Sequence, residues 1–140
     1  MAIQQISVFV ENKQGKLVET VKTLAENDIN IRAMSIADTK DFGILRMITS
    51  DNAKTKEVLS DDTVVNTTEV IAVKMADRPG SLYQVIDILS KAGVNIEYMY
   101  AFTASDALGA YVVFRVDDVP QAQQLMVDNG LQSLKENDLD

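Results

Sequence analysis

An internal repeat constrains the fold of this chain more than any other feature. When the sequence is shifted by 65 positions, Gly15 falls on Gly80 and Asn30 falls on Asn95. The apolar residues that coincide under the same shift are Ile6 with Ile71, Val8 with Val73, Leu17 with Leu82, Leu24 with Leu89, Ile31 with Ile96 and Met34 with Met99. Glycines and apolar residues fix backbone shape and core packing, so their coincidence predicts two copies of one fold.

The first copy has the pattern of two helices and four strands. Its opening run, "IQQISVFVE", alternates apolar and polar residues as a half-buried strand does, and an amphipathic helical stripe begins at Leu17. Two extended runs follow, "INIRAMSIA" and "ILRMITS". A helix over residues 52–60 and a short strand over residues 63–67 complete the copy. The predicted order is β-α-β-β-α-β.

The second copy repeats this order more clearly. Its strands are predicted at "EVIAVKM", "VNIEYMYAF", "AYVVFRV" and residues 131–134, and its helices begin near Leu82 and cover residues 119–129. Two helices over one face of a four-stranded antiparallel sheet form the ferredoxin-like arrangement. The sequence therefore predicts an α+β fold with two tandem ferredoxin-like units.

We expect the two units to be domains covering residues 1–67 and 68–140. No Gly, Pro or Ser cluster lies near Thr67 and Thr68, so the junction has no flexible linker. A unit of about 70 residues buries only about 60% of its unfolded surface and is marginally stable alone. We therefore expect the units to pack side by side.

Composition removes several classes of function. The chain contains neither cysteine nor histidine, so disulfides, thiolate sites and Ser-His or Cys-His catalysis cannot be built from it. A net charge of −8 disfavours nucleic acid, which is normally bound by clustered Lys and Arg. No apolar run is long enough to span a membrane. The start, "MAIQQISVFVEN", lacks the marks of a signal peptide, and we expect a cytoplasmic protein.

The candidate site is the glycine turn that occurs in both copies, "ENKQGKL" at residues 11–17 and "ADRPGSL" at residues 76–82. Each turn lies between a predicted strand and a predicted helix. The first N–H groups of a helix have no partner inside it, and the helix dipole makes them attractive to a carboxylate. Glycine leaves the approach open and tolerates positive φ. On the alternative interpretation, Gly15 and Gly80 only permit a tight turn.

Two further groups of residues have alternative roles. Asn30 and Asn95 begin the second strand of each copy, either as turn residues with left-handed backbone or as amides that contact a ligand. The larger apolar side chains of the second strands are expected to belong to the core of the sheet faces rather than to a pocket; they are Met34, Tyr98, Met99, Tyr100 and Phe102.

The run "VIAVKMADRPGSLYQVIDILSKAGVNI", residues 70–96, resembles the ACT domain, and the whole chain is similar to two ACT domains in tandem. ACT domains are small regulatory modules that bind amino acids in biosynthetic enzymes and regulators. The first copy, "ISVFVENKQGKLVETVKTLAENDINI", follows the same plan with departures. It has Asn12, Lys13 and Gln14 where the second copy has Asp, Arg and Pro, and Asp28 where the second has Gly93.

The resemblance implies amino-acid sites at interfaces between ACT units. Each site would combine the turn before the first helix of one unit with the start of the second strand of its neighbour. Carried over by position, the first site comprises Asn12, Gln14, Gly15, Lys16, Leu17, Asn30 and Ile31. The second comprises Asp77, Arg78, Pro79, Gly80, Ser81, Leu82, Asn95 and Ile96. The resemblance implies no catalytic residue, no metal and no cofactor.

The expected function is that of a stand-alone sensor, because ACT domains usually accompany a catalytic domain and this chain has none. It would bind a free amino acid, form a homodimer and modulate a separate metabolic enzyme. The alternative is a structural or assembly subunit of an amino-acid-metabolism enzyme, with no ligand of its own. A small acid–base enzyme is disfavoured because acidic residues such as Asp117 and Asp118 fall at predicted turns and caps.

Overall fold

The computed structural model describes residues 3–38, 41–60, 63–103 and 110–135. It divides into two compact units, one built on Gln4–Thr68 and one on Glu69–Leu139. They are called the N-terminal unit and the C-terminal unit below. In the described part of the chain, no helix is long and apolar enough to cross a membrane.

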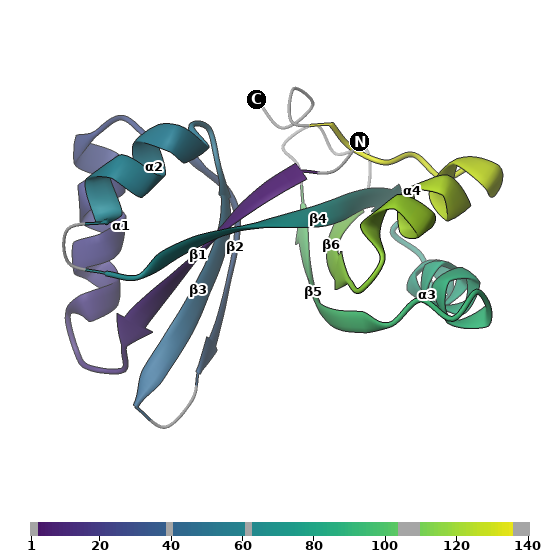
Figure 1. Ribbon diagram of the computed structural model, residues 1–140, viewed down its shortest axis with the longest axis horizontal. Helices are drawn as coiled ribbons and strands as arrows, with labels where there is room; N and C mark the ends of the chain where they lie inside the picture. Colours follow the sequence, from purple (N-terminus) through teal and green to yellow (C-terminus); the bar gives the residue numbers. More distant parts are fainter. Residues whose placement is uncertain (1–2, 39–40, 61–62, 104–109, 136–140) are drawn as a thin grey trace. The chain divides into compact units, whose positions relative to one another are not determined.

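The N-terminal unit is a sheet with two helices on one face (Figure 1). Its elements are β1 (Ile3–Glu11), α1 (Lys16–Glu26), β2 (Ile31–Asp38), β3 (Phe42–Thr49), α2 (Asn52–Leu59) and the start of β4 (Val65–Met75). The strand order is β2-β3-β1-β4. Both β1 and β2 are antiparallel to β3, with Val8 opposite Leu45 and Met34 opposite Met47.

Alternation along β1 and β3 builds the core of this unit. Ile6, Val8 and Val10 are buried together on one face of the sheet, because side chains two residues apart point the same way. The remaining members of the cluster are Leu24 from α1, Leu59 from α2, Ile29, Leu45 and Met47. Leu24 and Thr20 are the buried residues of α1, whereas Leu17 and Val18 of its apolar stripe remain exposed.

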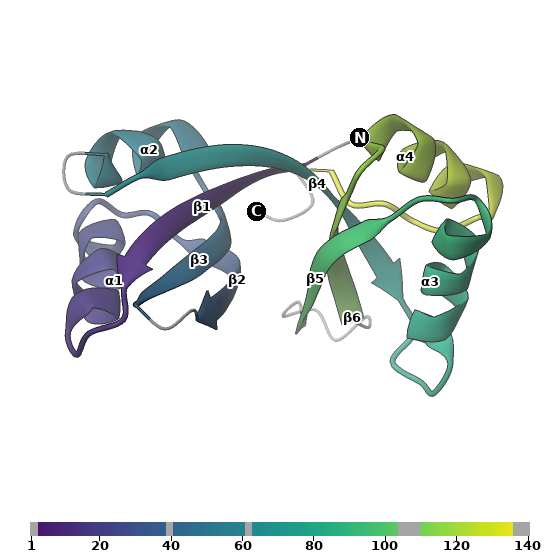
Figure 2. The same cartoon turned by 60° about the horizontal axis from the view of Figure 1, so that its bottom comes forward.

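The C-terminal unit repeats the plan. It contains the later part of β4, α3 (Ser81–Lys91), β5 (Ile96–Thr103), β6 (Ala110–Val116) and α4 (Val119–Asp128), with the strand order β4-β6-β5. In Figure 2, α3 and α4 lie on the same face of this sheet. Phe114 of β6 is fully buried in the core, between Val85 and Leu89 of α3 and Met126 of α4 in the same cluster. The predicted ferredoxin-like plan is confirmed for both units.

One strand joins the two units, which the sequence prediction missed. Separate strands were expected at residues 63–67 and at "EVIAVKM", but β4 runs without a break from Val65 to Met75. Its eleven residues include six β-branched side chains and neither Gly nor Pro, so nothing in the sequence interrupts the extended backbone. The domain limits of 1–67 and 68–140 stay a prediction.

The last predicted strand is shorter than expected. Residues 131–134 form an isolated bridge between Ser133 and Val73 instead of a full strand. Two backbone hydrogen bonds hold the segment to β4, from Lys74 N–H to the Gln132 carbonyl at 2.9 Å and from Leu134 N–H to the Ala72 carbonyl at 2.8 Å.

The expectation for the aromatic and Met side chains was right in part. Tyr100 is buried, Phe102 stacks on Tyr111 with ring centroids 5.3 Å apart, and Met99 packs against the core of the C-terminal unit. Met34 was wrongly expected in the core, since 42% of its surface is exposed. It lies on the edge strand β2 and, unlike Met99 on the edge strand β5, does not pack against the core cluster of its own unit.

Candidate functional site: two glycine turns

The two glycine turns have nearly the same backbone. Gly15 has φ of +89° and Gly80 has φ of +90°, and each immediately precedes the first residue of a helix. The N–H of Lys16 donates to the Lys13 carbonyl at 3.2 Å, and the N–H of Ser81 donates to the Arg78 carbonyl at 3.3 Å. Glycine is required because positive φ strains any residue with a Cβ.

Both turns leave the start of the following helix open. No side chain caps α1 or α3, whereas Asp51 and Asp118 cap α2 and α4 through their carboxylates. Apart from its own chain neighbours, a Cβ placed on Gly15 or Gly80 would meet no atom of a described residue within 4 Å. The two residues after the first helical position are Leu17 and Val18 in α1 and Leu82 and Tyr83 in α3. In the described part of the chain, their N–H groups have no hydrogen-bond acceptor. These are free donors of the kind that bind a carboxylate.

Most of the turn residues predicted for a site are exposed. In the first turn Asn12, Gln14 and Gly15 are exposed, and Leu17 keeps 37% of its surface exposed. In the second turn the exposed members are Asp77, Arg78, Pro79, Gly80 and Leu82, while Ser81 is buried. The two turns thus present their backbone and their first apolar helical residue to solvent.

The predicted asparagines lie at the other end of the helix from the turn. Asn30 follows α1 and Gly15 precedes it, and eleven helical residues span about 16 Å. Asn95 and Gly80 are related in the same way across α3. The structure therefore does not bring the turn and the asparagine of one unit together, and a site that uses both needs two units.

The backbone role proposed for the asparagines is wrong. The left-handed residues are Asp28, with φ of 59°, and Gly93, with φ of 77°, two positions before each asparagine. Asn30 instead donates its N–H to Ser50 Oγ, and Asn95 donates its N–H to Asp117 Oδ1, both at 3.0 Å. Both asparagines are exposed. Among the described residues their side-chain amides have no partner, so they are available to a ligand.

Sequence reasoning missed two cavities, one beside each turn. A cavity of about 270 Å³ lies beside the start of α1; its charged lining residues are Glu11, Lys16 and Glu19. One of about 400 Å³ lies beside the start of α3; its charged lining residues are Lys74 and Arg78. Each draws on a strand, a helix and a later segment of its own unit, and only tertiary packing brings these together. The residue of the N-terminal unit equivalent to Lys74 is Phe9. The charge at this position is therefore not repeated, and the sequence repeat did not reveal the cavities.

Comparison with protein families identifies the fold. The model of the ACT domain pair matches residues 1–140. The chain belongs to the ACT domain family. The resemblance seen in the sequence is therefore confirmed, and the N-terminal and C-terminal units correspond to the paired ACT domains. ACT domains are regulatory rather than catalytic modules. A search of curated proteins found no match.

Solved structures give the same fold. A protein from Bacteroides thetaiotaomicron is 38% identical, with a TM-score of 0.91, over 99% of this chain and 96% of that one. The ligand-free regulatory subunit of aspartate kinase from Thermus thermophilus is 12% identical, with a TM-score of 0.66, over 89% and 88% of the two chains. E. coli aspartokinase III in complex with lysine and aspartate is 18% identical, with a TM-score of 0.52, over 91% of this chain and 31% of that one.

Proposed function

We propose that this ACT pair is a stand-alone amino-acid sensor that modulates a separate metabolic enzyme. The effector is a free amino acid. Its carboxylate accepts hydrogen bonds from the free N–H groups after Gly15 or Gly80, and the exposed amide of Asn30 or Asn95 from a neighbouring ACT unit completes the site. A homodimer provides further neighbouring units.

The observation that carries the proposal is the pair of open, uncapped helix starts. The helices α2 and α4 begin at an aspartate cap, so an uncapped start is not a general feature of the described helices. Gly15 and Gly80 have positive φ in a turn that no neighbouring atom fills. The ACT family and the likeness to regulatory subunits of aspartate kinase support a regulatory role.

A thermal-shift screen of the proteinogenic amino acids tests the proposal. An amino acid at 100 times its dissociation constant should stabilise the protein by roughly 2.7 kcal/mol, which raises the melting temperature by several degrees. Stabilisation by one amino acid or a small group of related ones is expected. No shift with any amino acid at millimolar concentration would contradict the sensor and favour the assembly subunit.

Gly80→Val places a side chain where the effector carboxylate should approach, and we expect it to abolish the shift. Gly93→Val is the matched control, because Gly93 also has positive φ and open space around it but lies at the far end of α3. Both variants carry similar backbone strain. The turn is not the site if Gly80→Val still binds, or if Gly93→Val loses binding to the same extent while remaining folded.

A further inference from the structure

The two cavities occupy equivalent places in the repeat but differ in charge. Each is lined by the end of the first strand of its unit, the start of the following helix and a segment near the last strand. The equivalent positions are Phe9 and Lys74, Glu11 and Ala76, Lys16 and Ser81, Glu19 and Gln84, and Thr20 and Val85. The N-terminal cavity therefore has two carboxylates and one cation, and the C-terminal cavity has two cations and, among its described lining residues, no carboxylate.

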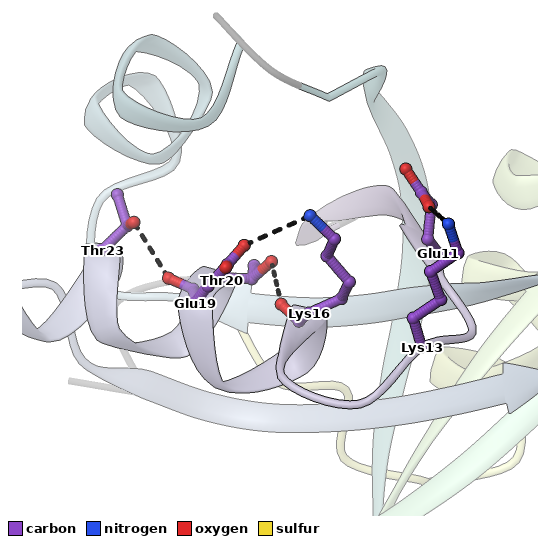
Figure 3. Close-up of polar contacts among 6 residues, drawn as sticks. All are labelled: Glu11, Lys13, Lys16, Glu19, Thr20 and Thr23. Carbon is purple, nitrogen blue, oxygen red and sulfur yellow. Dashed lines mark hydrogen bonds and ion pairs between the residues drawn. The ribbon is translucent and has the colours of Figure 1, made fainter.

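The charges of the N-terminal cavity are already paired within the protein. Lys16 Nζ lies 3.6 Å from Glu19 Oε2, and Glu11 Oε2 lies 3.2 Å from Lys13 Nζ (Figure 3). Glu19 also lies in the first turn of α1, where a negative charge offsets the helix dipole. An incoming anion would have to displace these partners, so this cavity is a poor anion site.

The cations of the C-terminal cavity have no ion-pair partner in the described part of the chain. Neither Lys74 nor Arg78 forms an ion pair with a described residue, although Lys74 is half-buried. The first turn of α3 contains no acidic residue and its N-terminus has no side-chain cap. Positive charge from two side chains and from the helix start thus collects around a cavity that no carboxylate of the described residues pairs with.

We propose that the C-terminal cavity binds a small organic dianion, separately from the amino-acid effector. Two unpaired cations match two negative charges, and a guanidinium suits the bidentate geometry of a carboxylate or phosphate. The cavity volume of about 400 Å³ lies in the range of small-molecule sites. Ser81 and Gln84 supply neutral polar groups, and Met75, Val85 and Leu131 supply an apolar wall for a short carbon skeleton.

The direct test is a titration of the full chain with inorganic phosphate and with malonate at constant ionic strength, followed by ¹H–¹⁵N NMR. We expect saturable shifts of the backbone amides of Lys74, Gln84 and Leu131, which line the cavity and are not among the N–H groups proposed to bind the effector carboxylate. Saturation by phosphate alone identifies a phosphorylated ligand, saturation by malonate alone identifies a dicarboxylate, and saturation by both supports a dianion of either kind. No saturable shift with either anion overturns the proposal.

Charge variants distinguish specific anion binding in the C-terminal cavity from non-specific electrostatic attraction of anions. Lys74→Gln and Arg78→Gln should each weaken binding by about tenfold, as expected when one charge-assisted hydrogen bond is lost. Gln84→Glu, which copies the N-terminal unit, should abolish it. Lys13→Gln is the matched control, because Lys13 is the repeat equivalent of Arg78 and is exposed. Equal weakening by Lys13→Gln would overturn the proposal, as would unchanged binding in Arg78→Gln and Lys74→Gln.

This inference does not depend on the proposed sensor. Gly80→Val blocks the turn without removing either cation, and Lys74→Gln removes a cation without touching the turn. Anion binding with a silent amino-acid screen would contradict only the sensor. Amino-acid binding without a response to phosphate or malonate would contradict only the dianion site.

Discussion

The N-terminal and C-terminal units share a backbone plan but differ in the chemistry at the start of their first helix. In α1, the first turn contains an acidic residue that is paired with Lys16. In α3, the first turn has no acidic residue, and Arg78 just before it forms no ion pair with a described residue. Duplication thus preserves the residues that set φ and the core, while charges around the helix diverge. The two cavities at equivalent places of the repeat therefore differ in charge.

The turn after the first helix provides a second contrast. Asp28 and Gly93 occupy equivalent positions, and both have positive φ. An L-residue with a Cβ pays a strain cost there that glycine does not. The N-terminal unit therefore adopts the left-handed conformation with a strained Asp28, and the C-terminal unit adopts it with the unstrained Gly93.

The largest expected effect on stability comes from the cores of the two units, which are equivalent in the repeat. Leu24 and Leu89 coincide in the repeat, and their exposed fractions are 1% and 0%. Leu24→Ala and Leu89→Ala should each lower the free energy of unfolding by about 2–5 kcal/mol, since each leaves a cavity in its own cluster. Urea unfolding followed by circular dichroism measures this. A loss below about 1 kcal/mol in one variant would show that the two cores are not equivalent.

Exchanging the residue types at Asp28 and Gly93, which both have positive φ, tests the difference in backbone strain between the two units. Gly93→Asp should lower the free energy of unfolding by about 1 kcal/mol, because it introduces the strain that Asp28 already carries. Asp28→Gly should raise stability by a smaller amount, because the flexible unfolded chain offsets part of the relief. Thermal unfolding of both variants beside the wild type gives the two signs. If both variants changed the stability in the same direction, the difference in backbone strain between Asp28 and Gly93 would be contradicted.

The capped helices should respond more modestly and in the same way. Asp51 accepts a hydrogen bond from the Lys54 N–H at 3.0 Å, and Asp118 accepts one from the Gln121 N–H at 3.1 Å. Asp51→Ala and Asp118→Ala should each lower the free energy of unfolding by about 1 kcal/mol. Chemical unfolding of the two single variants provides the measurement. A difference of several-fold between them would show that only one carboxylate acts as a cap.

Local patterns predicted most of the fold because the repeat and the 2.0 and 3.6 residue periodicities are local properties of the sequence. Glycine positions predicted both turns because positive φ is a property of single residues. The continuous β4 was missed because a change of unit need not interrupt a strand. Met34 was misassigned because alternation identifies a face of the sheet, and only the tertiary structure shows which residues of that face are covered.

The residues proposed for the site were chosen from the sequence and stay a prediction, whereas their geometry comes from the structure. Gly15, Gly80 and the asparagines were identifiable from spacing. Their separation along α1 and α3, and the two cavities, follow from tertiary packing and could not be predicted from the chain alone. The unpaired state of Lys74 and Arg78 is likewise a three-dimensional property, because it depends on which carboxylates come near.

The most direct test of the sensor is a ¹H–¹⁵N NMR titration of the full chain with the amino acid that stabilises it most. The amides that follow Gly15 or Gly80, together with the side-chain amide of Asn30 or Asn95, should shift and saturate at one concentration. Saturation confined to other residues, with these signals unchanged, would contradict the claim that the glycine turns bind the effector.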